Sequence, residues 1–350
     1  MVLVFMMAAA LWGIGAAMKA PPRLRWGMVA GLWAGVVLAQ AVLPAGNPLR
    51  TATGGDLRVW LAVGVVAVVI LGYRRGIGAL RVRARPVEAA APAPGSFRPA
   101  ELDRYARHII LREIGGAGQK RLKAARVLVV GAGGLGSPAL MYLAASGVGV
   151  IGVVDADVVE GSNLQRQIIH TDARIGLPKV FSAETAMRAL NPFIEVRPYQ
   201  RRLDEASAAA LIAEYDLVLD GTDNFDTRYL VNRVCVDLGK PLISGAITQW
   251  EGQVSLFDPG RGGPCYDCVF PHRPAPGMVP GCAEAGVAAP LPGVIGAMMA
   301  MEAVKHLTGA GEGLRGRVMI HDALFAETRV IRAPAREGCA VCGGRGGRAA

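Results

Sequence analysis

Three stretches near the start of the chain consist almost entirely of apolar residues. They cover residues 2–18, 26–45 and 57–73, and Gln40 and Arg58 are the polar side chains inside them. Each stretch is close to the ~20 residues of a helix that crosses a bilayer. Because they are apolar all round, the pattern predicts a transmembrane region over residues 1–85 with about three helices. Two alternatives remain: the first stretch as a secretory signal, and all three as buried helices of a soluble domain.

The pattern changes after residue 100 to an alternation of short apolar runs and helical stretches. A Pro- and Ala-rich segment at residues 86–100 precedes this change and is predicted to be a linker. Apolar runs end near residues 130, 155, 220 and 245, and each of the first three is followed by a helical pattern. Such alternation is typical of a doubly wound, Rossmann-like α/β fold with a mostly parallel sheet. We assign this domain to residues 101–343 and a flexible tail to residues 344–350.

The positive charge of the chain is concentrated beside the apolar stretches. Residues 1–100 carry 11 Lys and Arg against 2 Asp and Glu, whereas residues 101–350 carry 27 against 26. A nearly neutral body argues against a nucleic-acid partner, and basic loops beside apolar helices are typical of cytoplasmic flanks. Lys19, Arg23 and Arg25 form one such loop, and Arg74 and Arg75 open another. The sequence therefore predicts a protein of the inner (cytoplasmic) membrane whose catalytic domain faces the cytoplasm.

A glycine-rich turn follows the first apolar run of the α/β domain. Gly131, Gly133, Gly134 and Gly136 join this run to a helical stretch, and Asp155 ends the next run. Glycines let the backbone approach phosphate oxygens, the helix amino end attracts anions, and the later carboxylate suits ribose hydroxyls. The pattern indicates a nucleotide site. Taken alone, it fits an NAD-dependent oxidoreductase equally well.

Four cysteines form two Cys-x-x-Cys pairs: Cys265 with Cys268, and Cys339 with Cys342. In a reducing cytoplasm such thiols are poor candidates for disulfides, and four thiolates match a tetrahedral structural zinc site. A closed site of this kind would clip the end of the domain to its core without catalysing a reaction. Two separate redox pairs or plain surface thiols are the alternatives. Cys235, in a helical stretch, is expected to be a small core residue.

Taken together, the motifs resemble those of the E1-like (ubiquitin-activating-type) adenylyltransferases of the HesA/MoeB/ThiF family. Within that family the chain is most similar to the molybdopterin-synthase adenylyltransferases, with thiamine-pathway relatives close behind. The resemblance covers residues 101–343 and leaves the first hundred residues outside it. It rests on Arg104-Tyr-Ala-Arg107, the glycine motif at 131–136, Ser162-Asn-Leu-Gln-Arg166, Gly176-Leu-Pro-Lys179, Thr222-Asp223-Asn224, the paired Cys-x-x-Cys and Ala285-Gly-Val-Ala-Ala-Pro-Leu.

The resemblance implies a homodimer that binds ATP with Mg²⁺ and the carboxy-terminal Gly-Gly of a ubiquitin-like sulfur-carrier protein. The expected products are an acyl-adenylate and pyrophosphate, and the expected pathway is molybdenum cofactor biosynthesis through the molybdopterin synthase small subunit. No rhodanese-like segment follows the second Cys-x-x-Cys, so we expect a separate sulfur donor. The thiamine-pathway carrier is the nearest alternative, and a tRNA-modifying relative is a more remote one.

Adenylation creates negative charge on the phosphates and the leaving pyrophosphate, so positioned cations and a metal ion supply most of the catalysis. The family pattern assigns catalytic roles to Asp223, which would hold Mg²⁺, to Arg166 and Lys179, and to Arg107, which would reach the ATP of the partner subunit. It also implies a set of nucleotide-binding residues. These are Gly131, Gly133, Gly134, Gly136, Asp155, Ser162, Asn163, Leu164, Gln165, Arg166, Lys179, Asp223 and Asn224.

Each of these assignments has a simpler alternative. Arg166 and Lys179 could be solvated surface charges, and Asp223 could cap the following helix. Cys282 is a candidate nucleophile for a covalent link to the carrier, with a buried thiol as the alternative. A noncatalytic carrier-binding membrane protein would lack the ATP ligands, whereas the chain has all of them. The apolar region is expected to act as a tether, because two polar groups are too few for a transport path.

Overall fold

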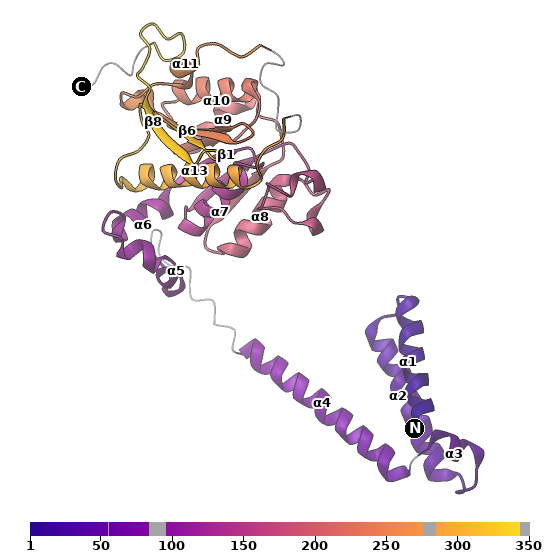
Figure 1. Cartoon of the computed structure of the whole chain (residues 1–350). Coiled ribbons are helices and arrows are strands. Elements are labelled where there is room, and N and C mark those ends of the chain that lie inside the picture. The colour runs from indigo at the N-terminus through magenta and orange to yellow at the C-terminus, as the bar shows by residue number, and fades with distance from the viewer. Residues whose placement is uncertain (55, 84–95, 276–284, 344–350) are drawn as a thin grey trace. The chain divides into compact units, whose positions relative to one another are not determined.

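The computed structural model describes residues 1–54, 56–83, 96–275 and 285–343, and the chain divides into two compact units, Met1–Ala91 and Pro92–Ala350 (Figure 1). Most of the predicted linker, the predicted tail and Cys282 lie outside the described residues.

The first unit contains the apolar helices. They are α1 (Val2–Ala17), α2 (Pro22–Val42), the short α3 (Pro48–Thr53) and α4 (Leu57–Arg83). Helix α2 and the Leu57–Ile77 part of α4 are long and apolar enough to cross a bilayer, and only 11% and 6% of their apolar windows are buried within the chain. Helix α1 has 16 residues, about 24 Å at 1.5 Å per residue, which is short of a ~30 Å hydrocarbon core. Two of the three predicted spans therefore meet the requirement, and the first does not.

Tryptophan and glutamine side chains hold the apolar helices together. The ring of Trp33 on α2 packs on Gly64 of α4, where a Cβ atom would lie 2.4 Å from the ring. Trp33 Nε1 donates a hydrogen bond to the carbonyl oxygen of Trp60 at 3.0 Å. Gln40, buried on α2, donates to Thr53 Oγ1 of α3 at 2.9 Å. This polar residue of the apolar stretches thus serves to close the turn after α2.

The second unit is built on one eight-stranded sheet with the order β3-β2-β1-β4-β5-β6-β7-β8. The first five strands in this order pair in parallel, and β6, β7 and β8 are added in antiparallel. The prediction of a mostly parallel sheet is right for that half and missed the antiparallel extension, so the sheet is mixed. The strands are β1 (Arg126–Val130), β2 (Val150–Val154), β3 (Glu195–Tyr199), β4 (Leu217–Asp220), β5 (Leu242–Ile247), β6 (Glu251–Phe257), β7 (Arg317–Asp322) and β8 (Glu327–Arg332).

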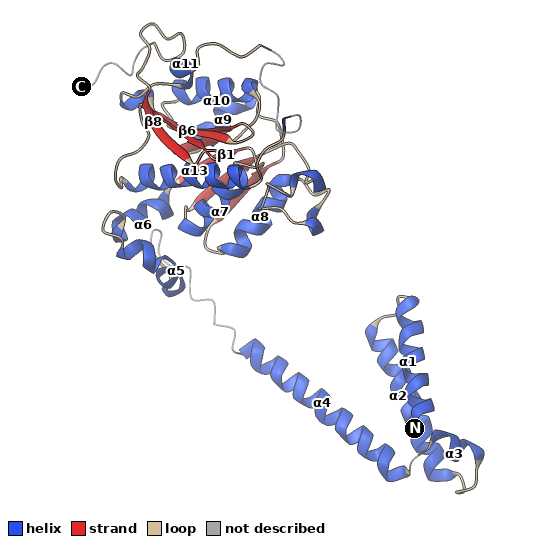
Figure 2. Ribbon diagram, in the orientation of Figure 1, coloured by secondary structure: helices blue, strands red, loops and turns tan. Residues whose placement is uncertain are grey.

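Helices cover both faces of this sheet, which confirms the Rossmann-like α/β class (Figures 1 and 2). Alternate residues of β1 serve the two faces, since Val127 and Val129 join one core and Leu128 and Val130 the other. The first core includes side chains of α6 (Gly115–Ala124), α7 (Gly136–Ser146), α8 (Lys179–Leu190) and α13 (Pro290–Thr308). The second includes side chains of α9 (Glu205–Ala213), α10 (Phe225–Asp237) and α11 (Tyr266–Val269). Helix α5 (Pro99–Ile110) packs on α6.

The parallel strands bring the sequence motifs to one edge of the sheet. Val130, the last residue of β1, is in register with Val154 of β2 on one side and with Asp220 of β4 on the other. The segments that follow these strands carry the glycine turn, Asp155 and Asp223. After β1 the chain forms β2 and β3 on one side of β1 and then crosses to β4 and β5 on the other side. This edge is therefore the topological switch point, where open α/β sheets place ligands.

Candidate active site

A cleft of about 1200 Å³ opens at the carboxyl edge of the parallel strands. It brings together side chains and backbone that lie up to 156 residues apart in the sequence, from Val130 to Gly286. Eight of the predicted nucleotide residues line it: Gly131, Gly133, Gly134, Asp155, Arg166, Lys179, Asp223 and Asn224. Sequence motifs that were recognised separately therefore form one cavity, large enough for a ligand the size of a nucleotide with part of a second substrate.

The glycine turn depends on two of its glycines in different ways. Gly131 has a φ of +94°, a conformation that residues with a side chain rarely adopt. Gly136 begins α7, and a Cβ atom there would lie 1.9 Å from the carbonyl oxygen of Gly131. Gly136 does not line the cleft. Its role is to let α7 start directly beneath the turn, so that the helix amino end faces the cleft.

Asp155 organises the same turn from the neighbouring strand. One oxygen of its carboxylate accepts a hydrogen bond from the Ala132 backbone N–H at 2.8 Å, and the other accepts from the Asp157 N–H at 2.8 Å. Both donors are backbone N–H groups, and the half-buried carboxylate still lines the cleft. Each carboxylate oxygen has further lone pairs, which are available to ribose hydroxyls.

His170 supports the turn from below and was not predicted from the sequence. Its ring nitrogens lie 2.9 Å from the carbonyl oxygen of Ala132 and 2.9 Å from Ser182 Oγ. Burial lowers the pKa of His170, an effect larger than the opposing hydrogen bond to Ala132. The neutral ring therefore donates to the carbonyl and accepts from the serine. This arrangement ties the glycine turn to α8, whose first residue is Lys179.

Lys179 and Arg166 supply positive charge to the cleft. Lys179 is only 5% exposed, and its Nζ lies 2.8 Å from Asp157 Oδ2. Arg166 is half-buried and donates from Nη2 to Asn163 Oδ1 at 2.9 Å. Lys179 is thus not a solvated surface charge, and both cations face the cavity. Asn163 orients Arg166 without lining the cleft, and neither do Ser162, Leu164 and Gln165.

The side chain of Asp223 has no structural role among the described residues. The residue that caps α10 is Asn224, whose Oδ1 accepts from the Thr227 N–H at 2.8 Å. Among the described residues, no hydrogen bond or ion pair engages the exposed Asp223 carboxylate. The capping alternative is therefore wrong. A free carboxylate in the same cleft as two cations fits Mg²⁺ bound together with phosphate, because this ion favours one or two carboxylates plus phosphate oxygens.

Several cleft residues escaped the sequence analysis. Gln167 is buried in the lining, and its Oε1 has no hydrogen-bond partner among the described residues. A buried unpartnered amide facing a cleft indicates a ligand contact. In the sequence, the position of Gln167 directly after Arg166 was the signal that could have identified it. Arg228 carried no motif signal because its partners are distant in sequence. Further arginines line the cleft on the side of α9 and α10: Arg201, Arg202, Arg233 and Arg273.

The roles predicted for Arg107 and Cys282 are not tested by the described residues. Arg107 is exposed on α5 and does not line the cavity of its own chain. The prediction that it serves the nucleotide of a partner subunit stays a prediction. Cys282 lies outside the described residues, and its proposed nucleophilic role is untested.

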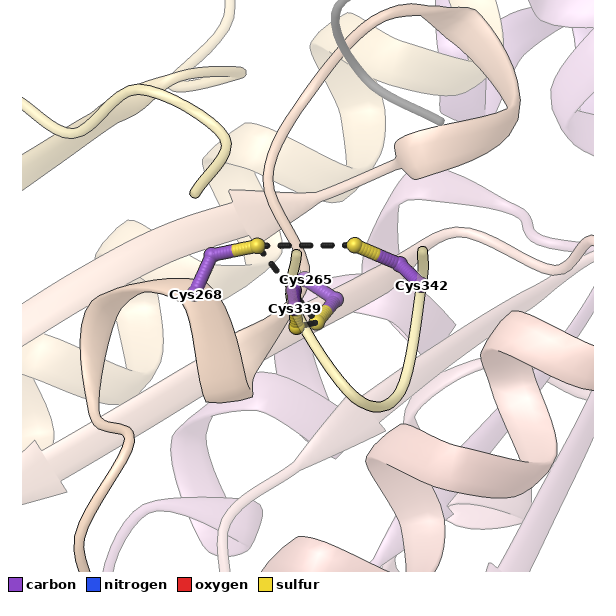
Figure 3. A group of neighbouring side chains, drawn as sticks. All are labelled: Cys265, Cys268, Cys339 and Cys342. Carbon is purple, nitrogen blue, oxygen red and sulfur yellow. Dashed lines mark hydrogen bonds between the residues drawn. The ribbon is translucent and has the colours of Figure 1, made fainter. Parts of the chain in front are cut away.

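The four paired cysteines form one cluster (Figure 3). Cys265 and Cys268, at the start of and within α11, meet Cys339 and Cys342 from the end of the described chain. All four are buried, and their sulfur atoms lie within 4.8 Å of one another. Three of the Sγ–Sγ distances are 3.8, 3.6 and 3.4 Å. They are too long for disulfides and close to the ~3.8 Å edge of a tetrahedron with Zn–S bonds of ~2.3 Å. The cluster fits zinc.

The electrostatics of the cluster also suit a cation. Burial raises the pKa of Cys265 and of Cys268. For Cys339, burial acts in the same direction, but backbone N–H groups of Cys342 and Val341 and the neighbouring thiols outweigh it and lower the pKa to about 7. Without a cation, Cys339 therefore ionises more readily than Cys265 or Cys268. A bound divalent ion would stabilise all four thiolates, so its affinity should rise with pH.

A family model described as the ThiF family matches residues 105–341, which include the whole cleft and the first three cysteines of the cluster. The chain belongs to the ThiF family. The resemblance inferred from the motifs is thereby confirmed, and so is the assignment to a family of adenylyltransferases.

Several named relatives are similar over this part of the ThiF-family chain. It is 51% identical over 247 residues to the sulfur carrier protein adenylyltransferase of Thermus thermophilus, which covers 69% of the chain and 91% of that protein. It is 49% identical to the SAMP-activating enzyme E1 of Haloferax volcanii, over 71% of the chain and 91% of that protein. It is 47% identical to the adenylyltransferase and sulfurtransferase MOCS3 of Bos taurus, over 75% of the chain and 58% of that protein.

Solved structures share the fold at lower sequence identity. A crystal structure of Escherichia coli MccB with AMPCPP and MccA has a TM-score of 0.62 and 23% identity, over 69% of this chain and 74% of that one. Selenomethionine PaaA has a TM-score of 0.61 and 20% identity, over 86% and 90%. These likenesses agree with the mixed sheet and its helical layers.

Proposed function

We propose that this chain catalyses the ATP-dependent adenylation of the carboxy-terminal Gly-Gly carboxylate of a ubiquitin-like sulfur-carrier protein. The observation that carries the proposal is the single cleft that joins the glycine turn, two cations and the free carboxylate of Asp223. The names of similar proteins, a sulfur carrier protein adenylyltransferase and MOCS3, support the same reaction class.

In the proposed mechanism the glycine turn and the amino end of α7 hold the phosphates, and Asp155 holds the ribose. A carboxylate oxygen of the carrier attacks the α-phosphorus in line and pyrophosphate leaves, giving an acyl-adenylate. Lys179 would exchange its bond to Asp157 for phosphate oxygens, and Arg166 would neutralise the developing charge. Magnesium, when bound with the phosphates, supplies further positive charge, and Asp223 would be its protein ligand.

The carrier tail has room beyond the nucleotide residues. The cleft continues along the turn between β5 and β6 and past α11, where it is lined by Ala246, Thr248, Gly252, Gln253 and Phe270. An NAD-dependent oxidoreductase would leave Arg166, Lys179 and Asp223 without a role. A noncatalytic carrier-binding protein would not retain them in one cavity.

We infer further that the carrier is the molybdopterin synthase small subunit and that the enzyme works as a zinc-containing homodimer with a separate sulfur donor. The names MoeZ and MOCS3 among the similar proteins support the pathway, and the cysteine geometry supports the zinc. In a homodimer, the exposed Arg107 would contact the ATP bound to the partner subunit. The thiamine-pathway carrier is the alternative within the same reaction.

Carrier-dependent exchange of radiolabelled pyrophosphate into ATP tests this function. We expect exchange when a molybdopterin-type carrier with a terminal Gly-Gly is added, because reversal of adenylation regenerates ATP. A carrier lacking the last glycine is the matched control and should support no exchange. Exchange with the thiamine-type carrier alone would move the enzyme to that pathway, and exchange with neither carrier would contradict the proposal.

We propose that the first unit tethers the enzyme to the inner membrane with the second unit in the cytoplasm. Two helices of sufficient length and the arginines near the carboxy-terminal end of α4 support this placement. The full chain should therefore sediment with membranes after a carbonate wash, and a fragment starting at residue 96 should stay in solution. The fragment should keep its exchange rate within about threefold, since the apolar helices contribute nothing to the cleft. A soluble full chain would contradict the tether.

A further inference from the structure

Arg228 is a buried arginine in the first turns of α10, with only 5% of its surface exposed. Its Nη1 donates to Ser244 Oγ at 3.0 Å. Its Nη2 donates to two carbonyl oxygens, that of Gly245 at 3.0 Å and that of Thr222 at 2.5 Å. The ring of Tyr266 lies over the guanidinium at 5.7 Å. The side chain therefore joins β5 to the loop that follows β4.

Asp220, the last residue of β4, is the acidic partner of Arg228. It is completely buried, and its Oδ2 lies 3.6 Å from Arg228 Nε. Its Oδ1 accepts from the backbone N–H of Thr222 at 3.0 Å and from Thr222 Oγ1 at 2.7 Å. Asp220 thus folds the next residues into a turn in which a side chain replaces a backbone acceptor.

These contacts converge on one peptide unit. The carbonyl oxygen that Arg228 holds belongs to Thr222, and the nitrogen of the same peptide belongs to Asp223. Gly221 is fixed on the near side by its N–H bond to the carbonyl oxygen of Val130 at 3.0 Å. Asn224 is fixed on the far side as the cap of α10. Every residue of the turn is held, and the carboxylate of Asp223 is the part that projects freely.

Stability does not explain such a pair. Removing two charges from water costs several kcal/mol, and well-packed apolar residues often replace a buried ion pair without loss of stability. A guanidinium that binds three acceptors in fixed directions does provide precise orientation. We propose that Arg228 and Asp220 are positioning residues, which set the Thr222–Asp223 peptide so that the Asp223 carboxylate meets the metal-bound phosphates. This inference rests on the proposed adenylation. It assigns the placement of the Asp223 carboxylate to Arg228 and Asp220, which carry none of the motif signals.

The substitution Arg228→Lys tests the inference. Lysine keeps the positive charge but cannot satisfy Ser244, Gly245 and Thr222 together. We expect kcat for pyrophosphate exchange to fall about 100-fold, as for a small misplacement of a reacting group. The Mg²⁺ concentration for half-maximal exchange should rise about tenfold or more, as when a metal ligand loses its support. The KM for ATP should change less than about threefold, since the glycine turn is intact.

Arg315→Lys is the matched control. Arg315 pairs with the buried Asp258 at 3.2 Å, after β6, and neither residue lines the cleft. Both variants are compared at equal distance below their own Tm. If Arg228→Lys has the same kcat and Mg²⁺ dependence as Arg315→Lys, the positioning role is wrong.

Two further measurements separate this inference from the proposed function. In the ligand-free protein, amide hydrogen exchange of residues 221–224 should speed up about tenfold in Arg228→Lys, as expected for loss of a charged hydrogen bond, and stay unchanged in Arg315→Lys. This readout needs no carrier, so it stands even if wild-type protein exchanges no pyrophosphate. In an Asp223→Asn background, Arg228→Lys should lower the residual activity less than about twofold. Fully additive losses would overturn the proposal.

Discussion

Asp223→Ala should lower the rate of carrier-dependent pyrophosphate exchange by about 10³-fold, the size of effect seen when one preorganised electrostatic group is removed. Asp223 is the free carboxylate in the loop between β4 and α10, and no described residue is hydrogen-bonded or ion-paired to it. Its loss should remove the protein ligand of the magnesium ion that accompanies the phosphates. The folded state should be unaffected, because Asn224, not Asp223, caps α10.

Two variants control this prediction, and both are assayed with saturating ATP and carrier. Asp223→Asn keeps the shape but not the charge, and should lose nearly as much activity if charge on the metal ligand matters. Asp237→Ala removes an exposed carboxylate at the other end of α10 and should leave the rate unchanged. A Tm within about 2 °C of wild type is expected for all three. Exchange that survives Asp223→Ala at more than a tenth of the wild-type rate would remove Asp223 from the mechanism.

Cys268→Ser should abolish stoichiometric zinc binding and lower the Tm by about 10 °C or more. Structural zinc sites contribute on the order of 10 kcal/mol in small domains. Retaining even a third of that here would correspond to about 10 °C at ~3 °C per kcal/mol for a domain of this size. The cause is the loss of the link between α11 and the Cys339–Cys342 segment. Metal content by mass spectrometry and thermal unfolding with and without chelator measure both effects.

Cys235→Ala is the control for the zinc prediction. Cys235 is also buried but belongs to α10 and is not one of the four clustered cysteines, and burial raises its pKa far above that of an ordinary thiol. The variant should retain one zinc per chain and respond to chelator as wild type does. If wild-type protein contains no zinc after purification in metal-replete medium, or if chelator leaves its Tm unchanged, the cluster is not a structural zinc site.

The parts of the fold that sequence predicted well are those encoded by local patterns. The glycine turn at Gly131–Gly136 and the Cys-x-x-Cys pairs are short motifs whose residue types are required by backbone conformation or by ligand chemistry. Four parallel strands, β1, β2, β4 and β5, were found because they are largely buried and read as continuous apolar runs. The parallel strand β3, which is mostly half-buried and carries Glu, Arg and Pro, was missed. Strand β7 was missed because it is half-buried and has only three consecutive apolar residues, and β8 because it is exposed along its whole length and rich in charged residues.

The candidate site shows the same division. Arg166, Lys179 and Asp223 were predicted from motifs, and the cleft contains all three. The choice between Asp223 and Asn224 as helix cap needed coordinates, because both residue types are good caps. His170 and Arg228 were missed because Ala132, Ser182, Ser244 and Gly245, which they contact, lie 12 to 38 residues away along the chain. Helix α1 was over-interpreted because hydropathy alone does not fix where a helix ends.

The cysteine cluster also has a consequence for the unfolded chain. Cys265 and Cys339 are 74 positions apart, so a metal that joins them closes a ring containing α13, β7 and β8. A cross-link of that span removes conformational entropy equivalent to about 4 kcal/mol from the denatured ensemble. A denatured chain that keeps its metal would therefore start refolding with the α13, β7 and β8 segments already confined to a loop closed at the metal. Part of the site's contribution thus arises before any native contact has formed.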